Sequence, residues 1–157
     1  MVIGLVRFKG GVRVKLNEEV IRVGQLASGW EEAVKQCGQL LIENGNVEAR
    51  YVHAMVDNVH TLGAYIVIAP GVALPHARPE DGVLQQGISV SVLQEPVSFF
   101  SDKEAIVFIG LAAQDKVMHL HLLKAVAEVI GDSEKLAHLK KARTVREVQQ
   151  LFDKESG

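Results

Sequence analysis

The chain has 157 residues, about the length of one ordinary domain. Apolar residues make up 48% and charged residues 23%, which is typical of a globular protein and excludes a disordered one. Seventeen Lys and Arg against nineteen Asp and Glu give a net charge of -2, so no basic excess is available to neutralise a nucleic-acid backbone. We therefore expect one globular domain that does not bind nucleic acid.

Cysteine content and hydropathy predict a cytoplasmic protein. The single cysteine, Cys37, cannot form an internal disulfide, and no Cys/His grouping has the spacing of a zinc site. The longest apolar runs, 64–69 and 105–113, are far shorter than the ~20 residues that cross a bilayer. Charged side chains interrupt the first sixteen positions, so no signal peptide is expected.

Two helices are predicted in the first half of the chain. Ser28 followed three residues later by Glu31 matches a capping box, and helical spacing of apolar residues then continues to a stop at Gly45. Cys37 lies on the apolar stripe of this helix, which favours a core position over a reactive thiolate. A second helix, over 47–62, places its apolar residues on one face.

The strands of the expected sheet are short. Loose alternation in the first twenty-odd residues predicts one or two strands, with a turn at Gly10-Gly11. A buried strand is predicted over 64–69, followed by a loop that runs to about Gly82. Alternation over 87–93 predicts a strand with one wet face, and 105–111 is another apolar strand.

The C-terminal part is predicted to be helical. The segment 117–130 is apolar over most of its surface and should be deeply packed. Two further helices are capped by Asp132 or Ser133 and by Thr144, which forms a second capping box with Glu147. Together these elements predict a single α/β domain with a mixed parallel and antiparallel sheet of about five strands flanked by helices.

The loop over 68–82 contains the residues best suited to chemistry. It holds three of the four prolines, which stiffen a loop without regular hydrogen bonding. His76 follows Pro75, and Arg78 comes two residues later, so an imidazole and a guanidinium can face one solvent cavity. A histidine can act as a nucleophile and an arginine can bind phosphate oxygens. On local composition alone, a loop histidine without function and a surface charge remain the alternative interpretation.

The string Ala-Pro-Gly-Val-Ala-Leu-Pro-His-Ala-Arg-Pro-Glu-Asp-Gly-Val, over 69–83, resembles the active-site signature of the enzyme IIA (EIIA) domains of the mannitol–fructose class, type 2, in the bacterial sugar phosphotransferase system. The similarity extends to five other segments: Trp30–Ala33, Glu43–Gly45, Arg50–Met55, Gly110–Ala113 and His119–Leu123. It predicts an EIIA domain over 15–157, preceded by an N-terminal extension, 1–14, that contains a strand. The Arg-Pro-Glu sequence after the histidine is most similar to the L-ascorbate-type branch.

The resemblance implies a phosphotransferase that works as a phosphohistidine carrier without cofactor or metal. In that family, the histidine of the Pro-His motif accepts a phosphoryl group from the carrier HPr. It then passes the group to a IIB component that serves the membrane component IIC. His76 matches this acceptor, and His119 matches a second histidine that lies beside it. The implied substrate is L-ascorbate or a related sugar acid, and family behaviour suggests phosphorylation at Nε2. Arg78 as a phosphate contact is a physical inference from its charge.

The predicted elements place these histidines consistently. His76 lies beyond the carboxyl end of the 64–69 strand and His119 beyond that of the 105–111 strand, where sites of α/β sheets collect. His119 also lies in the first turn of its helix, which favours an anion. The alternative for His119 is a packed residue without function, since Leu122 and Val126 share its helix face.

Two other functions remain open from the residues. A regulatory domain could accept phosphate on His76 and control a transporter or transcription factor by its charge. A metal-dependent hydrolase could use His76, His119 and Asp115, although their spacing is not that of a metal site. His53 and His60 are seven residues apart on one helix, about 10 Å, which is too far for a shared metal ion.

Overall fold

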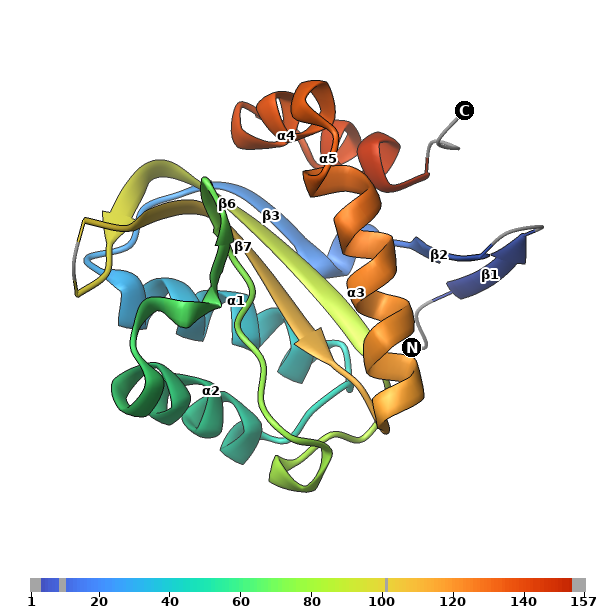
Figure 1. Ribbon diagram of the computed structural model, residues 1–157, viewed down its shortest axis with the longest axis horizontal. Coiled ribbons are helices and arrows are strands. Elements are labelled where there is room, and N and C mark those ends of the chain that lie inside the picture. The colour runs from blue at the N-terminus through green and yellow to red at the C-terminus, as the bar shows by residue number, and fades with distance from the viewer. Residues whose placement is uncertain (1–3, 9–10, 101, 154–157) are drawn as a thin grey trace.

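A five-stranded mixed sheet forms the centre of the molecule, in the order β3-β6-β7-β5-β4 (Figure 1). The computed structural model describes residues 4–8, 11–100 and 102–153. The strands are β3 (Ile21–Gln25), β4 (Val67–Ala69), β5 (Gly71–Ala73), β6 (Gly87–Ser98) and β7 (Glu104–Ala112). The predicted fold class, an α/β domain with a mixed sheet of about five strands, is confirmed.

Helices cover both faces of this sheet (Figure 1). One face carries α1 (Trp30–Glu43) and α2 (Ala49–Leu62), and the other carries α3 (Lys116–Ile130), α4 (Ser133–Lys140) and α5 (Val145–Asp153). Each face has its own buried apolar cluster, so the sheet separates two cores. No helix in the described part of the chain is long and apolar enough to span a membrane.

The strand directions decide where the loops meet. β5 runs parallel to β7, whereas β6 is antiparallel to β7 and β4 is antiparallel to β5. Because β5 and β7 run in the same direction, the segments that follow them leave the sheet at the same edge. The segment after β5 contains His76, and the segment after β7 leads into α3, which contains His119.

An N-terminal hairpin precedes the sheet. Its antiparallel strands are β1 (Gly4–Phe8) and β2 (Gly11–Lys15), and β2 lies beside α3 and α5. Strands were predicted in this region, and the sheet strand β3 follows them. Of the predicted turn at Gly10-Gly11, Gly10 lies outside the described residues.

The predicted capping box at Ser28 and Glu31 is wrong. Gly29 is the N-cap of α1, and its carbonyl accepts the first helical bond, from the Ala33 N–H at 3.1 Å. The Ser28 hydroxyl instead donates to the Glu32 side chain at 2.8 Å. Extended backbone at Gly29 starts the helix one residue later than the motif predicts, so the Ser28 side chain cannot reach the backbone amides of the first turn.

The two C-terminal caps are at the predicted residues, but Thr144 and Glu147 form only one half of the predicted capping box, because the Glu147 carboxylate accepts from the Thr144 hydroxyl and not from its backbone N–H. The Asp132 carboxylate accepts from two backbone amides at the start of α4, those of Glu134 and Lys135. The Thr144 hydroxyl accepts from the Glu147 N–H and donates to the Glu147 carboxylate, both at 3.2 Å. These side chains satisfy amides that have no partner within the helix.

The strand predicted over 64–69 is present only as β4, residues 67–69, and the predictions that it is buried and that only a loop follows it are wrong. Residues 64–66 form a 3-10 turn, and β4 is an edge strand whose Ile68 side chain is 45% exposed. The predicted loop contains β5, which is inserted between β4 and β7 and has Val72 fully buried. Gly71, at a φ of +81°, lets the chain reverse after Pro70, so the apolar residues that follow take the interior position.

The prediction of a wet face on the 87–93 strand is also wrong. Ser89 and Ser91 are 0% and 1% exposed, because helices cover both faces of β6. The Ser89 hydroxyl donates to the Cys37 carbonyl of α1 at 2.8 Å. A small hydroxyl side chain thus satisfies its polar group while α1 lies close against the sheet.

Deep packing of the 117–130 helix over most of its surface is not observed. α3 buries one face, with Leu122, Val126 and Val129 in the core. Val117 and Leu120 are each 64% exposed on the opposite face, next to the site described below. Apolar composition alone could not tell a buried face from an exposed apolar one.

Gly38 sets the distance between α1 and α2. A Cβ atom there would lie 2.6 and 2.9 Å from the two methyl carbons of Val52. We expect Gly38→Ala to lower the free energy of unfolding by about 1–3 kcal/mol through overpacking, despite the better helix propensity of alanine. In a Val52→Ala background the same change should be neutral or stabilising by up to about 1 kcal/mol. Urea unfolding of the wild type, the two single variants and the double variant measures both values. An equal loss in both backgrounds would contradict the close contact.

Candidate functional site

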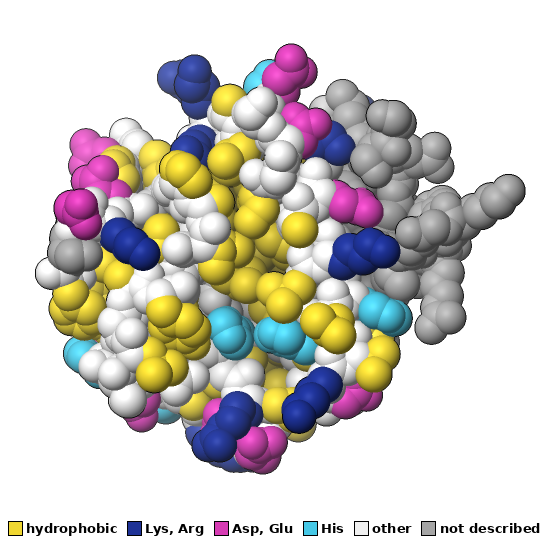
Figure 2. Space-filling view, in the orientation of Figure 1, with side chains coloured by type: hydrophobic (Ala, Val, Ile, Leu, Met, Phe, Trp, Pro, Cys, Tyr) yellow, Lys and Arg dark blue, Asp and Glu magenta, His cyan; other side chains and the backbone are white. Residues whose placement is uncertain are grey.

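His76 and His119 form the centre of the site. Their ring centroids lie 5.5 Å apart, with the ring planes inclined by 49°. Figure 2 shows two adjacent histidine side chains in a mostly apolar, hollowed face of the molecule. The segment with His76 is joined to the end of β7, because the Leu111 N–H donates to the Pro75 carbonyl at 3.0 Å. The predicted convergence of two distant segments at this edge of the sheet is therefore present.

The backbone determines which nitrogen of His76 carries the proton. Its Nδ1 atom lies 2.8 Å from the Leu74 carbonyl oxygen. A carbonyl oxygen can only accept, so Nδ1 carries the hydrogen and the lone pair of the neutral ring lies on Nε2. The Asn58 amide donates to the His76 carbonyl at 3.3 Å, and the Tyr65 ring packs edge-on at 6.1 Å. The half-buried imidazole is thus held in one tautomer and against fixed neighbours.

His119 lies in the first turn of α3. Asp115 is the N-cap of this helix and accepts from the Met118 N–H at 2.8 Å, and its carbonyl accepts from the His119 N–H. Partial burial lowers the pKa of His119, and the nearby His76 lowers it further. Its ring is therefore uncharged at neutral pH and can donate one N–H to an anion.

A cavity of about 480 Å³ surrounds the two histidines. Its lining residues come from α2, from the 3-10 turn after α2, from the segments after β5 and β7, and from the start of α3: Asn58, Leu62, Tyr65, His76, Ala77, Arg78, Pro79, Ala113, Asp115, Lys116 and His119. The cavity therefore combines two imidazoles, a guanidinium, an ammonium group and the carboxylate of Asp115 with apolar walls.

The structure places Arg78 at this cavity, as predicted, but its side chain also has acidic neighbours. Its Nε atom lies 3.4 Å from the Glu80 carboxylate and 3.8 Å from that of Asp81, and the side chain is largely exposed. Lys116, which the sequence reasoning missed, is a second cation at the cavity. The sequence could have indicated this, because Lys116 directly follows Asp115, the N-cap of the helix that carries His119.

The remaining sequence candidates lie elsewhere. His60 contacts Glu31 of α1 at 3.1 Å and packs edge-on against Trp30. Burial raises the pKa of the Cys37 thiol to about 12, which makes it an inert core residue. No three His, Cys, Asp or Glu side chains group as metal ligands within 4–8, 11–100 and 102–153.

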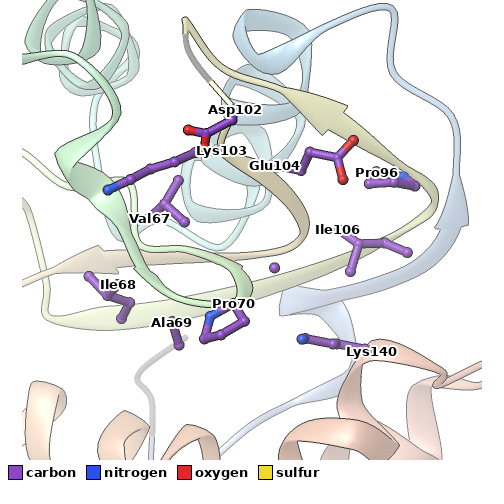
Figure 3. A pocket seen from close by; sticks show the side chains of 11 residues that line it. Val67, Ile68, Ala69, Pro70, Pro96, Asp102, Lys103, Glu104, Ile106 and Lys140 are labelled. Atoms are coloured by element: carbon purple, nitrogen blue, oxygen red, sulfur yellow. The ribbon is translucent and has the colours of Figure 1, made fainter.

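A larger cavity of about 600 Å³ lies at the other end of β5 (Figure 3). Its walls are mainly apolar, and its charges are balanced between Lys103 and Lys140 and the carboxylates of Asp102 and Glu104. It shares no lining residue with the histidine cavity and contains neither histidine nor cysteine. Of these two cavities, only the smaller one is lined by histidine.

Comparison with known proteins identifies the family. The family model described as "Phosphoenolpyruvate-dependent sugar phosphotransferase system, EIIA 2" matches residues 15–155. The chain belongs to this family. The EIIA domain is 38% identical over 137 residues to the ascorbate-specific PTS system EIIA component of Escherichia coli K12, covering 85% of this chain and 89% of that protein.

Solved structures agree with this assignment. The EIIA domain superposes on the solution structure of the mannitol-specific cryptic enzyme IIA CmtB of E. coli with a TM-score of 0.81 and 32% identity, covering 88% of this chain and 95% of the other. It superposes on E. coli enzyme IIAMtl, solved in complex with phosphorylated IIBMtl, with a TM-score of 0.77 and 29% identity, covering 88% and 96%. The resemblance noted in the sequence is confirmed, and the chain is an EIIA component, a phosphoryl carrier of a sugar phosphotransferase system.

The lowered pKa of His119 makes stability depend on pH. Its folded pKa lies below the ordinary 6.5, so between the two values the unfolded chain binds more protons than the native domain. This contribution to stability is complete above about pH 6.5 and is lost as the pH falls through the folded pKa. We expect His119→Gln to lose less stability than the wild type between pH 7.5 and 5.5 in urea unfolding. Parallel losses in the two proteins would show that the pKa of His119 is not lowered.

Proposed function

We propose that this EIIA domain accepts a phosphoryl group from phospho-HPr on Nε2 of His76 and passes it to a IIB component in the cytoplasm. The observation that carries the proposal is the hydrogen bond between His76 Nδ1 and the Leu74 carbonyl, which leaves Nε2 unprotonated in a ring that lines the cavity. An unprotonated ring nitrogen is the required nucleophile.

The transfer step needs no proton movement. The Nε2 lone pair of His76 forms a bond to the phosphorus while the N–P bond of the donor phosphohistidine breaks. The electron pair of that bond returns to the donor ring. His76 keeps its Nδ1 proton on the Leu74 carbonyl throughout. Such a step requires mainly alignment and stabilisation of the phosphoryl oxygens.

The neighbours of His76 supply that stabilisation. The uncharged His119 ring can donate one N–H to a phosphoryl oxygen, and the first amides of α3 lie at the positive end of the helix dipole. Arg78 and Lys116 add two positive charges at the cavity. A phosphoryl group on His76 would in turn raise the pKa of His119, because a dianion favours the protonated ring.

Exposed apolar side chains around the cavity fit a protein donor and acceptor. Leu62 and Tyr65 line the cavity, and Val117 and Leu120 directly follow the lining residues Lys116 and His119 of α3; all four apolar side chains are exposed. Patches of this kind mark transient protein contacts. The complex of enzyme IIAMtl with phosphorylated IIBMtl supports a IIB partner. The similarity to ascorbate-specific EIIA components supports L-ascorbate or a related sugar acid as the transported substrate, with IIC as the membrane component.

The acceptor is tested with purified phospho-HPr and a IIB partner. We expect His76→Gln to abolish phosphorylation, followed by intact-protein mass spectrometry, and His119→Gln to slow it. His53→Gln, which changes an exposed histidine of α2, is the matched control and should behave as the wild type. Full phosphorylation of His76→Gln would overturn the assignment. Phosphorylation of the wild type without transfer to IIB would instead favour a regulatory domain.

Arg78 is expected to bind the phosphoryl oxygens. A hydrogen bond to a charged group contributes about 1.5–3 kcal/mol, so Arg78→Gln should lower kcat/KM for phosphorylation roughly 10- to 100-fold. The fold should be unaffected, because the side chain is largely exposed. Arg146→Gln, at an exposed position of α5, is the charge-matched control. An equal loss in both variants would show that only net charge matters.

A further inference from the structure

Next to His76, the hydroxyl of Tyr51 lies between two backbone groups that would bond directly to each other in a regular parallel sheet. His76 and Leu111 form an isolated parallel bridge, and one of its two bonds runs from the Leu111 N–H to the Pro75 carbonyl. The second bond of a regular parallel bridge would run from the Ala77 N–H to the Leu111 carbonyl. Here the Ala77 N–H donates to the Tyr51 hydroxyl oxygen at 2.9 Å, and this hydroxyl lies 2.7 Å from the Leu111 carbonyl oxygen.

The hydroxyl satisfies two backbone groups at once. Its single proton is donated to the Leu111 carbonyl, which is the shorter contact, while its oxygen accepts from the Ala77 N–H. The Ala77 carbonyl is a more distant second acceptor at 3.2 Å. Burial raises the pKa of Tyr51 to about 12, so the hydroxyl keeps its proton at neutral pH.

Tyr51 itself is fixed by the core. Its side chain is fully buried on α2, among the apolar residues that pack between α1, α2 and the sheet. The position of the hydroxyl is therefore set by the packing of α2 and not by the loop that it contacts. Two hydrogen bonds in series also span a wider gap than one N–H···O bond of ~2.9 Å.

We propose that Tyr51 is a positioning residue for His76. Its inserted hydroxyl holds Ala77 away from β7, while the Pro75 carbonyl remains bonded to Leu111. The chain is thereby fixed one residue before and one residue after His76, and the imidazole is held at its distance from His119. This inference rests on the proposed function, because the placement matters only if His76 takes part in phosphoryl transfer.

Loss of the hydroxyl has a definite structural consequence. Tyr51→Phe keeps the ring in the core but leaves the Ala77 N–H and the Leu111 carbonyl without their partner. These groups can recover a hydrogen bond only by closing directly on each other, which moves the backbone beside His76 toward β7. A displacement of about 1 Å of a reacting group can reduce a rate by roughly 100-fold.

The test compares Tyr51→Phe with Val56→Ala in phosphorylation by phospho-HPr. Val56 is a buried residue of the same helix, so its truncation destabilises the domain while the hydroxyl contact remains. We expect Tyr51→Phe to lower kcat roughly 10- to 100-fold with an unchanged KM for phospho-HPr, because the buried hydroxyl is not part of the partner surface. Val56→Ala should keep the wild-type kcat despite an equal or larger loss of stability. An unchanged kcat in Tyr51→Phe, or an equal fall in both variants, overturns the positioning role.

A second measurement does not depend on phosphorylation. The pKa of His119 is lowered in part by His76, so movement of His76 must change the titration of His119. NMR titration of the histidine rings in the folded proteins should show a shifted His119 curve in Tyr51→Phe and a wild-type curve in Val56→Ala. If the wild type accepts no phosphoryl group, the proposed function fails and this titration alone decides the positioning role. Coincident His119 curves in all three proteins would overturn it.

Discussion

The hydrogen bond from the Leu111 N–H to the Pro75 carbonyl is the contact on which the site depends. It attaches the segment after β5 to the end of strand β7, in the register in which His76 faces Leu111. Five residues after Leu111 the chain enters α3, whose first turn carries His119. One parallel pairing therefore brings together two imidazoles that are 43 positions apart in the sequence. Arg78, in the segment after β5, and Lys116, at the start of α3, line the same cavity for the same reason.

Two buried faces make this arrangement rigid. The sheet is covered by α1 and α2 on one side and by α3, α4 and α5 on the other, so both ends of the site are attached to packed cores. Tyr51 extends the core on the α2 side to the backbone next to His76. α3 has a different double role, because its inner face is buried while its outer face exposes Val117 and Leu120 beside the cavity. A partner protein can thus approach the histidines without opening the core.

Sequence patterns predicted the helices and the outline of the sheet, but they failed where a residue's neighbours come from distant segments. Ser89 and Ser91 alternate with apolar residues, as on a wet strand face, yet both are buried and Ser89 contacts α1. The 64–69 run has the composition of a buried strand, yet β5 takes the interior place after the reversal at Gly71. Local composition reports polarity and propensity, and neither contains the order of strands in the sheet.

The sequence alone determined the α/β class, the family resemblance and the two candidate histidines. Motif spacing and apolar periodicity are local properties, and they can be read without knowing which segments lie side by side. Only the tertiary structure decided the ring nitrogen that holds the proton, the presence of Lys116 at the cavity and the contact of Tyr51 with Ala77. Each of these depends on the positions of atoms from separate segments, and a hydrogen bond such as that of His76 at 2.8 Å or Ala77 at 2.9 Å is lost when the distance grows by a fraction of an ångström to about 1 Å.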